Sequence, residues 1–223
     1  MNIGIFGGTF NPIHHGHLIV AEQIREGFGL HRIYFIPSAN PPHKEGPIVD
    51  GRDRLAMVES AIDSNPSFYS SSREVTRGGS SYTIDTVLET RRDLGEGHTF
   101  AFILGSDAFQ DIRTWKDYRR LLKLCTFIVI SRPGADIERV RGVLTPFLTG
   151  PELNLRIQQV SADEIATSID IRHADIYFVS LPHIDISSST IRFMFSQGKS
   201  IRYQVPDTVL AYIISHKLYG VRS

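Results

Sequence analysis

The sequence has a single cysteine, no excess charge of either sign and no long apolar run, and each of these absences excludes something. Cys125 has no second cysteine for an intrachain disulfide, so a reducing, cytoplasmic compartment is expected. Lys and Arg together number 24, as do Asp and Glu, which argues against binding nucleic acid or an acidic membrane through overall charge. No apolar run approaches the length of a membrane span, and no leader peptide is apparent.

Short apolar runs alternate with helical patterns along the chain. Strands are expected at residues 3–6, 32–36, 99–104, 126–130 and 176–181, and helices at 18–28, 54–62, 82–94, 115–124, 189–197 and 206–218. Apolar runs without polar alternation are typical of parallel strands covered on both faces. The pattern therefore predicts an α/β fold: a Rossmann-like, doubly wound parallel sheet with helices on both faces and a small C-terminal helical portion.

No repeat, linker or low-complexity tract divides the chain, so we expect a single domain over residues 1–223. The segment from about Ala135 to Ala174 is atypical. It begins with a helical pattern, which Gly150-Pro151 ends, and then becomes polar and irregular. Residues 186–223 form the C-terminal helical portion. The sequence leaves the oligomeric state open and is compatible with a homo-oligomer.

The stretch Gly7 to His17, GGTFNPIHHGH, joins the first expected strand to the first expected helix. Ligands of parallel sheets bind at the carboxyl ends of strands, and a helix start offers N–H groups to an anion. Gly7 and Gly8 would let a ligand approach the backbone or permit positive φ. His14 and His17 are three residues apart, so they would share one helical face and could donate to phosphate oxygens.

This stretch has other interpretations. Its glycines do not fit the dinucleotide-binding fingerprint, and it lacks the lysine of a P-loop. A metal site is less favoured, because His14, His15 and His17 have no carboxylate or cysteine neighbours at familiar ligand spacing. A glycine-rich turn with surface histidines is the plainest alternative. The paired spacing at a strand-to-helix junction favours a phosphate site.

Two motifs resemble signatures of the nucleotidyltransferase superfamily. His14-His15-Gly16-His17 resembles its H-x-G-H motif, although the family usually has aspartate where this chain has Asn11. The segment Ile186-Ser187-Ser188-Ser189-Thr190-Ile191-Arg192 is similar to I-S-S-T-x-I-R. Hydroxyls and N–H groups at a helix start, followed by an arginine, suit a phosphate; a serine-rich helix cap is the alternative. Together the two motifs are more specific than either alone.

Further stretches resemble the bacterial nicotinate-mononucleotide adenylyltransferases. They are Asn40-Pro41-Pro42-His43-Lys44, residues 81–86 (SYTIDT), residues 104–108 (LGSDA) followed by Trp115, and the C-terminal residues 205–207, 212 and 218–220. The resemblance implies a reaction of ATP with nicotinate mononucleotide that gives nicotinate adenine dinucleotide and pyrophosphate, in NAD synthesis. It also implies Mg²⁺ on the triphosphate.

The resemblance assigns roles at the phosphate end. His17 would donate to the α-phosphate, while His14 and Arg192 would hold the β- and γ-phosphates. The remaining residues expected to contact ATP or its phosphates are Gly8, Thr9, Phe10, Gly16, Lys44, Ser188 and Ser189. Ser188 and Ser189 are expected to cap the helix there. Lys44 could equally be an ordinary surface lysine.

The resemblance also assigns the mononucleotide end, to Asn40, Tyr82, Thr83, Gly105, Asp107 and Trp115. Trp115 would stack on the pyridine ring, although core packing is its alternative. Asp107 would accept from a ribose hydroxyl. Asn40, Tyr82 and Thr83 would donate to the nicotinate carboxylate; the degree of preference for acid over amide stays open.

Competing functions remain open at this stage. Another nucleotidyltransferase, for nicotinamide mononucleotide, phosphopantetheine or glycerol phosphate, would share both signatures. A non-catalytic sensor of ATP or NAD is a second alternative, although it would not need to keep His14, His17 and Arg192. A nucleic-acid binder is disfavoured by the zero net charge.

Overall fold

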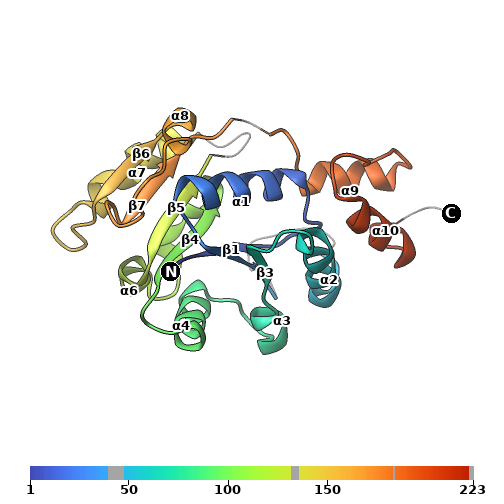
Figure 1. Cartoon of the computed structure of the whole chain (residues 1–223), viewed down its shortest axis with the longest axis horizontal. Coiled ribbons are helices and arrows are strands. Elements are labelled where there is room, and N and C mark those ends of the chain that lie inside the picture. Colours follow the sequence, from blue (N-terminus) through green and yellow to red (C-terminus); the bar gives the residue numbers. More distant parts are fainter. Residues whose placement is uncertain (40–47, 132–135, 183, 221–223) are drawn as a thin grey trace. The chain divides into compact units, whose positions relative to one another are not determined.

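The computed structural model describes residues 1–39, 48–131, 136–182 and 184–220 of the chain (Figure 1). Its seven-stranded sheet has the order β3 (Phe68–Ser70), β2 (Arg32–Pro37), β1 (Asn2–Gly8), β4 (Thr99–Gly105), β5 (Thr126–Ile130), β7 (Ile176–Val179) and β6 (Ile157–Val160). The pairs β1–β4, β4–β5, β5–β7 and β6–β7 are parallel. The 3-2-1-4-5 order is that of a doubly wound α/β sheet, so the expected fold class is confirmed.

The chain divides into two compact units, which are described separately. The first comprises Met1–Gly7, Glu22–Ile33 and Tyr82–His183, and the second comprises Gly8–Ala21, Tyr34–Ser81 and Ile184–Ser223. Helix α1 (His15–Gly27) begins in the second unit and ends in the first. The carboxyl end of β1, where ligands of such sheets bind, passes into the second unit at Gly8.

The first unit contains the central strands and the helices that follow them. These helices are α4 (Thr83–Leu94), α5 (Ser106–Phe109), the 3₁₀ turn η1 (Ile112–Thr114), α6 (Tyr118–Leu124), α7 (Ile137–Leu148) and α8 (Ala162–Ile165). Strands β4 and β5 are almost entirely apolar and buried, with Ala101 opposite Thr126 and Ile103 opposite Ile128. Figure 1 shows β6, β7, α7 and α8 of this unit, in yellow to orange, lying together.

The segment expected to be irregular contains two short elements, β6 and α8. Strand β6 lies at one end of the sheet order and pairs with β7 alone, so its Gln158 and Gln159 are not buried and give no apolar run. Helix α8 is four residues long and begins with a capping box, in which Ser161 and Glu164 bond each other's backbone N–H groups. That S-x-x-E spacing was a usable sequence signal for a helix start.

The second unit contains α2 (Gly51–Ile62), β3, α3 (Arg73–Arg77), α9 (Ser188–Ser196) and α10 (Asp207–Ser215). Helix α10 packs against α2 (Figure 1), where the Tyr212 hydroxyl donates to Asp53 at 3.0 Å. The short elements β3 and α3 were not expected from the sequence, because three to five residues cannot display a period of their own. Elsewhere the expected elements are present, with ends shifted by a few residues.

Helix α1, with 13 residues, is the longest helix of the described residues. Within the described part of the chain, no helix combines the length and the apolar composition that crossing a bilayer requires. Cys125 follows α6 and is partly exposed as a residue. Burial of its thiol raises the pKa of Cys125 to about 12, so it is not a thiolate at neutral pH.

Candidate active site

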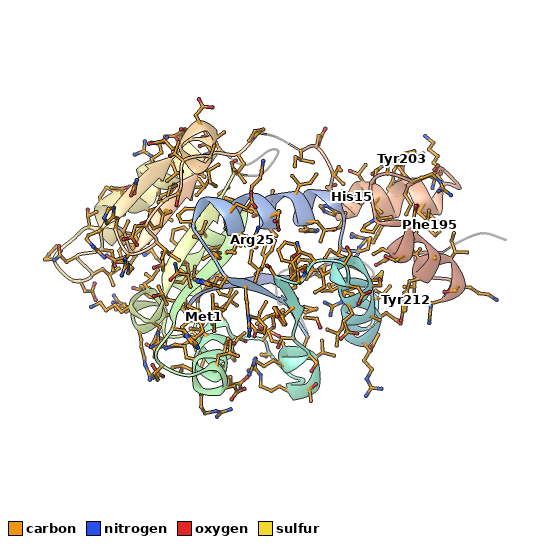
Figure 2. All side chains as sticks on the ribbon, viewed as in Figure 1. Met1, His15, Arg25, Phe195, Tyr203 and Tyr212 are labelled. Carbon is orange, nitrogen blue, oxygen red and sulfur yellow. The ribbon has the colours of Figure 1, made fainter. Side chains whose placement is uncertain are left out.

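The segment between β1 and α1 places two histidines against each other. The His14 carbonyl accepts from the N–H of His17 at 2.9 Å and of Leu18 at 3.3 Å, so His14 starts the first turn of α1. The imidazoles of His14 and His17 stack with their centroids 3.7 Å apart. Only 6% of His14 and 9% of His17 are exposed. The expectation that both lie on one face is therefore confirmed. Figure 2 labels His15 at the start of α1.

The orientation of the His17 ring is set by two contacts. The His14 backbone N–H donates to Nδ1 of His17 at 3.3 Å. A ring nitrogen that accepts carries no proton, so in the neutral ring the proton is on Nε2. The Phe10 ring packs edge-on against His17 with centroids 5.1 Å apart. His17 is thus held with a defined tautomer, in which Nε2 is the donor.

Glycines in this segment make room for aromatic rings. A Cβ on Gly8 would lie 2.8 Å from the Phe10 ring, and one on Gly16 would lie 3.0 Å from Nδ1 of His14. In the first unit, a Cβ on Gly7 would lie 2.9 Å from the Phe102 ring. None of the three has a positive φ, so positive φ as a reason for Gly7 and Gly8 is wrong. The close packing of rings requires them.

The second signature lies at the start of α9 and contacts the first directly. The Ser188 hydroxyl donates to the Pro12 carbonyl at 2.9 Å, and Nη1 of Arg192 donates to the Asn11 carbonyl at 2.8 Å. Both contacts are within the second unit. Segments more than 170 positions apart in the sequence therefore meet, which brings Arg192 to the loop that carries His14 and His17.

The cap of α9 differs from the expectation. Ser187 is the N-cap, and its hydroxyl accepts from the Thr190 N–H at 3.1 Å. Ser188 is the first helical residue and uses its hydroxyl on Pro12, while the Ser189 hydroxyl accepts from Arg192 at 3.5 Å. The expectation that Ser188 and Ser189 cap this helix is therefore wrong by one position, because the first of three serines takes the extended conformation of a cap.

This region of the second unit is suited to bind an anion. Neither α1 nor α9 has an acidic residue in its first turn, so no carboxylate there offsets the partial positive charge of the helix start. The imidazoles of His14 and His17 and the guanidinium of Arg192 add hydrogen-bond donors. Gly8, Thr9 and Phe10, expected to contact phosphates, belong to the same unit and precede these donors in the chain.

Three residues that hold this region were not predicted from the sequence. The Tyr219 hydroxyl donates to Oδ1 of Asn11 at 2.9 Å, and the Gln204 carbonyl accepts from the His15 N–H at 2.9 Å. The Arg54 guanidinium donates to the Thr9 carbonyl at 2.7 Å. Arg54 left a signal, because it stands four residues before Val58 on the apolar face of its helix, where a charge is unusual. Tyr219 lies in the C-terminal stretch that resembles the family, but the resemblance assigned it no role.

Tyr82 and Thr83, expected at the mononucleotide, lie in the first unit at the start of α4. Tyr82 is the N-cap residue and is 43% exposed, and Thr83 is the first helical residue. Nζ of Lys116 lies 4.7 Å from the centroid of the Tyr82 ring and 2.9 Å from a carboxylate oxygen of Asp85. Lys116, the residue after Trp115, therefore joins this segment to the start of α4.

The other predicted mononucleotide residues of the first unit follow β4. Gly105 is the last residue of β4 and is buried, and Asp107 is exposed in the short helix α5. Trp115 is half-buried and meets Phe102 edge-on, with centroids 6.5 Å apart. Its indole is therefore not enclosed in the core. Two further predicted residues, Asn40 and Lys44, lie outside the described residues.

The chain is similar to known proteins over nearly its whole length. A family model described as cytidylyltransferase-like matches residues 5–193. A protein of Geobacter metallireducens named "Probable nicotinate-nucleotide adenylyltransferase" is 41% identical over 98% of each chain. A protein of the same name from Moorella thermoacetica is 40% identical over 99% of this chain and 92% of its own. The resemblance read from the motifs is confirmed.

Solved structures give the same fold. The nicotinic acid mononucleotide adenylyltransferase of Plasmodium falciparum, complexed with NaAD, superposes with a TM-score of 0.71 at 22% identity, covering 99% of this chain and 98% of its own. A structure from Vibrio parahaemolyticus named "Putative Nicotinate-nucleotide Adenylyltransferase" has a TM-score of 0.63 at 16% identity. From the match to the family model and the identity to full-length relatives, the chain belongs to the cytidylyltransferase-like family, among relatives named as nicotinate-nucleotide adenylyltransferases.

Proposed function

We propose that this protein transfers the adenylyl group of ATP to nicotinate mononucleotide, giving nicotinate adenine dinucleotide and pyrophosphate, a step in NAD synthesis. The observation that carries the proposal is the contact between the two signatures, in which Arg192 donates to Asn11 and Ser188 to Pro12. It brings one guanidinium, two imidazoles and two helix starts without acidic residues to one loop. The relatives' names supply the choice of acceptor.

The reaction is an in-line displacement at phosphorus. A phosphate oxygen of the mononucleotide forms a bond to the α-phosphorus of ATP, and the bond from that phosphorus to the bridging oxygen breaks, so pyrophosphate leaves with the electron pair. The acceptor phosphate is already an anion at neutral pH, and no protein nucleophile or strong base is needed. The protein's task is to position both phosphates and to stabilise negative charge in the transition state.

Each donor in the second unit has a proposed role. His17 donates from Nε2 to the α-phosphate in the transition state, which is consistent with the tautomer that the His14 N–H sets. His14 and Arg192 hold the β- and γ-phosphates until they leave. Further phosphate contacts are proposed for Gly8, Thr9, Phe10, Gly16, Lys44, Ser188 and Ser189.

The first unit is proposed to bind the mononucleotide. The indole of Trp115 stacks on the pyridine ring, and Asp107 accepts from a ribose hydroxyl. Tyr82 and Thr83, with Asn40, donate to the nicotinate carboxylate, and Gly105 leaves room for the ligand beside the end of β4. The half-buried indole and the exposed Tyr82 support this assignment, since neither is used up in core packing.

The proposal includes the state of the substrate and of the protein. ATP enters as its Mg²⁺ complex, since triphosphate oxygens are ligands this ion prefers, and the ion offsets charge on the phosphates. Residues 1–223 act as a single nucleotidyltransferase domain, as the continuous match over residues 5–193 suggests. A cytoplasmic location, as expected from the single cysteine, completes the proposal.

The test is pyrophosphate release by the purified protein with Mg²⁺ and a panel of substrates. ATP with nicotinate mononucleotide is expected to be turned over faster than ATP with nicotinamide mononucleotide, phosphopantetheine or glycerol phosphate. Equal rates with acid and amide would remove the proposed preference for the acid. No pyrophosphate from any pair at saturating concentrations would favour a non-catalytic sensor, and a preference for CTP would replace the adenylyl group by a cytidylyl group.

A further inference from the structure

Arg54 is the largest fully buried side chain of the described residues, with no exposed surface. It lies in the first turn of α2, and its guanidinium makes four hydrogen bonds to main-chain carbonyl oxygens. Nε donates to Val49 at 3.0 Å and Nη1 to Thr9 at 2.7 Å, while Nη2 donates to Ser38 at 2.6 Å and to Ala39 at 3.0 Å. One planar side chain thus binds carbonyls from two separate connections of the chain.

The two connections are the one between β1 and α1, which contains Thr9, and the one between β2 and α2, which contains Ser38, Ala39 and Val49; these residues all belong to the second unit. The ends of β1 and β2 are also joined directly, because the Ser38 N–H donates to the Gly8 carbonyl at 2.9 Å. The Arg54 guanidinium therefore stabilises the loop between β1 and α1 through its hydrogen bond to Thr9. A hydrophobic side chain of similar volume would fill the same space without ordering these carbonyls.

The contact with Thr9 has a consequence for the next amide. A trans peptide unit is planar, and its N–H points opposite to its C=O. Because Arg54 holds the Thr9 carbonyl, the Phe10 N–H in the same peptide unit is fixed in the opposite direction, away from the guanidinium. Phe10 also has a φ of 47°, a conformation that non-glycine residues keep only where their surroundings enforce it.

Burying a cation costs free energy unless its hydrogen bonds are satisfied. Burial lowers the pKa of Arg54, with opposing contributions from Tyr219, Asp50 and Glu74. Arginine nevertheless stays protonated in proteins at neutral pH, so the group remains a cation. Carbonyl oxygens satisfy its hydrogen bonds, while the carboxylates of Asp50 and Glu74 offset part of its charge.

We infer that Arg54 is a positioning residue of the phosphate site: by holding the Thr9, Ser38 and Ala39 carbonyls it aims the Phe10 N–H at the triphosphate and adds its charge from behind the loop. The inference rests on the proposed function, in that it assumes a nucleoside triphosphate as ligand. Arg54 itself does not touch the reacting atoms; it acts through the backbone.

The test is the affinity for α,β-methylene ATP, measured by calorimetry on folded protein below its melting temperature. We expect Arg54→Met to weaken binding at least about tenfold, and Arg54→Lys, which keeps the charge but has no planar fork, to weaken it by about threefold. The control is Met57→Ala, which creates a cavity at another fully buried position of α2. The control should lower the melting temperature and leave the affinity within about twofold of wild type.

The outcomes separate this inference from the proposed function. Equal affinity in Arg54→Met and Met57→Ala would overturn the inference alone, since a purely structural role predicts that result. Failure of the wild-type protein to bind the analogue would overturn both. If the Arg54 variants do not fold, guanidinium NMR of the wild type decides: the analogue should shift the Arg54 resonances and slow their exchange, and unchanged signals would contradict the inference.

Discussion

The proposed phosphate region of the second unit and the proposed mononucleotide residues of the first unit are built differently. The phosphate loop is buried and held by side chains from distant parts of the chain, namely Arg54, Ser188, Arg192 and Tyr219. Tyr82 and Trp115 are more exposed, and the contact that joins their segments is an ion pair between Lys116 and Asp85 near the surface. Hydrogen bonds to buried main-chain groups order the first region, whereas an exposed ion pair joins the segments of the second.

This difference suits the two tasks. Stabilising a transition state requires donors that are already in place, because reorganising them during the reaction would cost part of the gain. Recognition of a pyridine ring requires a flat surface and a few donors, and surface ion pairs contribute little to stability. Changes to the phosphate region should therefore affect kcat and folding together. Changes near Trp115 should affect mainly the KM of the mononucleotide.

The largest effect is expected for His17→Ala. Removing the Nε2 donor should reduce kcat by about 10²- to 10³-fold, because this contact is proposed to strengthen in the transition state. The KM for ATP should change much less. Steady-state kinetics with nicotinate mononucleotide and ATP measure both values.

His15→Ala is the matched control for that variant. His15 is the variable residue of the H-x-G-H motif and lies in the same turn of α1, so its removal should leave kcat within about threefold of wild type. An unchanged kcat in His17→Ala would refute the role proposed for His17. Equal losses in both variants would show that the turn as a whole, and not the Nε2 donor, determines the rate.

An intermediate effect is expected for Trp115→Ala in the first unit. Loss of the stacking surface should raise the KM for the mononucleotide about tenfold and leave the KM for ATP nearly unchanged. Trp115→Phe, which keeps an aromatic face, should recover much of the difference. A larger change in the KM for ATP than in that for the mononucleotide would show that the indole serves the other substrate.

The contrast between the two regions also explains what the sequence could and could not predict. The contact of His14 with His17 was predictable, because residues three apart share one face of a helical turn. Arg192 was singled out through the resemblance of its motif, and its contact with Asn11 spans 181 positions. The contacts of Arg54 with Thr9 and of Tyr219 with Asn11, 45 and 208 positions apart, were not predicted. Contacts of that range depend on the tertiary fold, which the local pattern does not display.

The same limit applies to the fold. The central strands were predictable because each is a continuous apolar run, as in β4 and β5. Strands β3 and β6 lie at the two ends of the sheet order and have only one neighbour each, so they need fewer apolar residues. The cap of α9 was misplaced by one residue, because any of three successive serines satisfies the capping pattern.

The smallest effect is expected for Tyr219→Phe, which removes one hydrogen bond from the phosphate region. The Tyr219 hydroxyl donates to Oδ1 of Asn11, and its loss should cost about 1 kcal/mol of unfolding free energy. Because Asn11 stands in the loop before His14, kcat should also fall by about threefold. Tyr212→Phe is the control: it removes the hydrogen bond to Asp53 between α10 and α2 and should lower stability without lowering kcat.

The pH dependence of stability tests the same contact. Burial raises the pKa of Tyr219 above the ordinary value of 10.0, despite the opposing effect of Arg192 and Arg54. The folded protein therefore keeps the phenol proton at a pH where the unfolded chain releases it. The contribution of Tyr219 to the free energy of unfolding is complete below the unfolded pKa, and it is lost as the pH rises from there through the folded pKa. Denaturant melts should show wild type losing its advantage over Tyr219→Phe only above about pH 10. An advantage that disappears already near neutral pH would show that the phenol is not the protonated donor to Asn11.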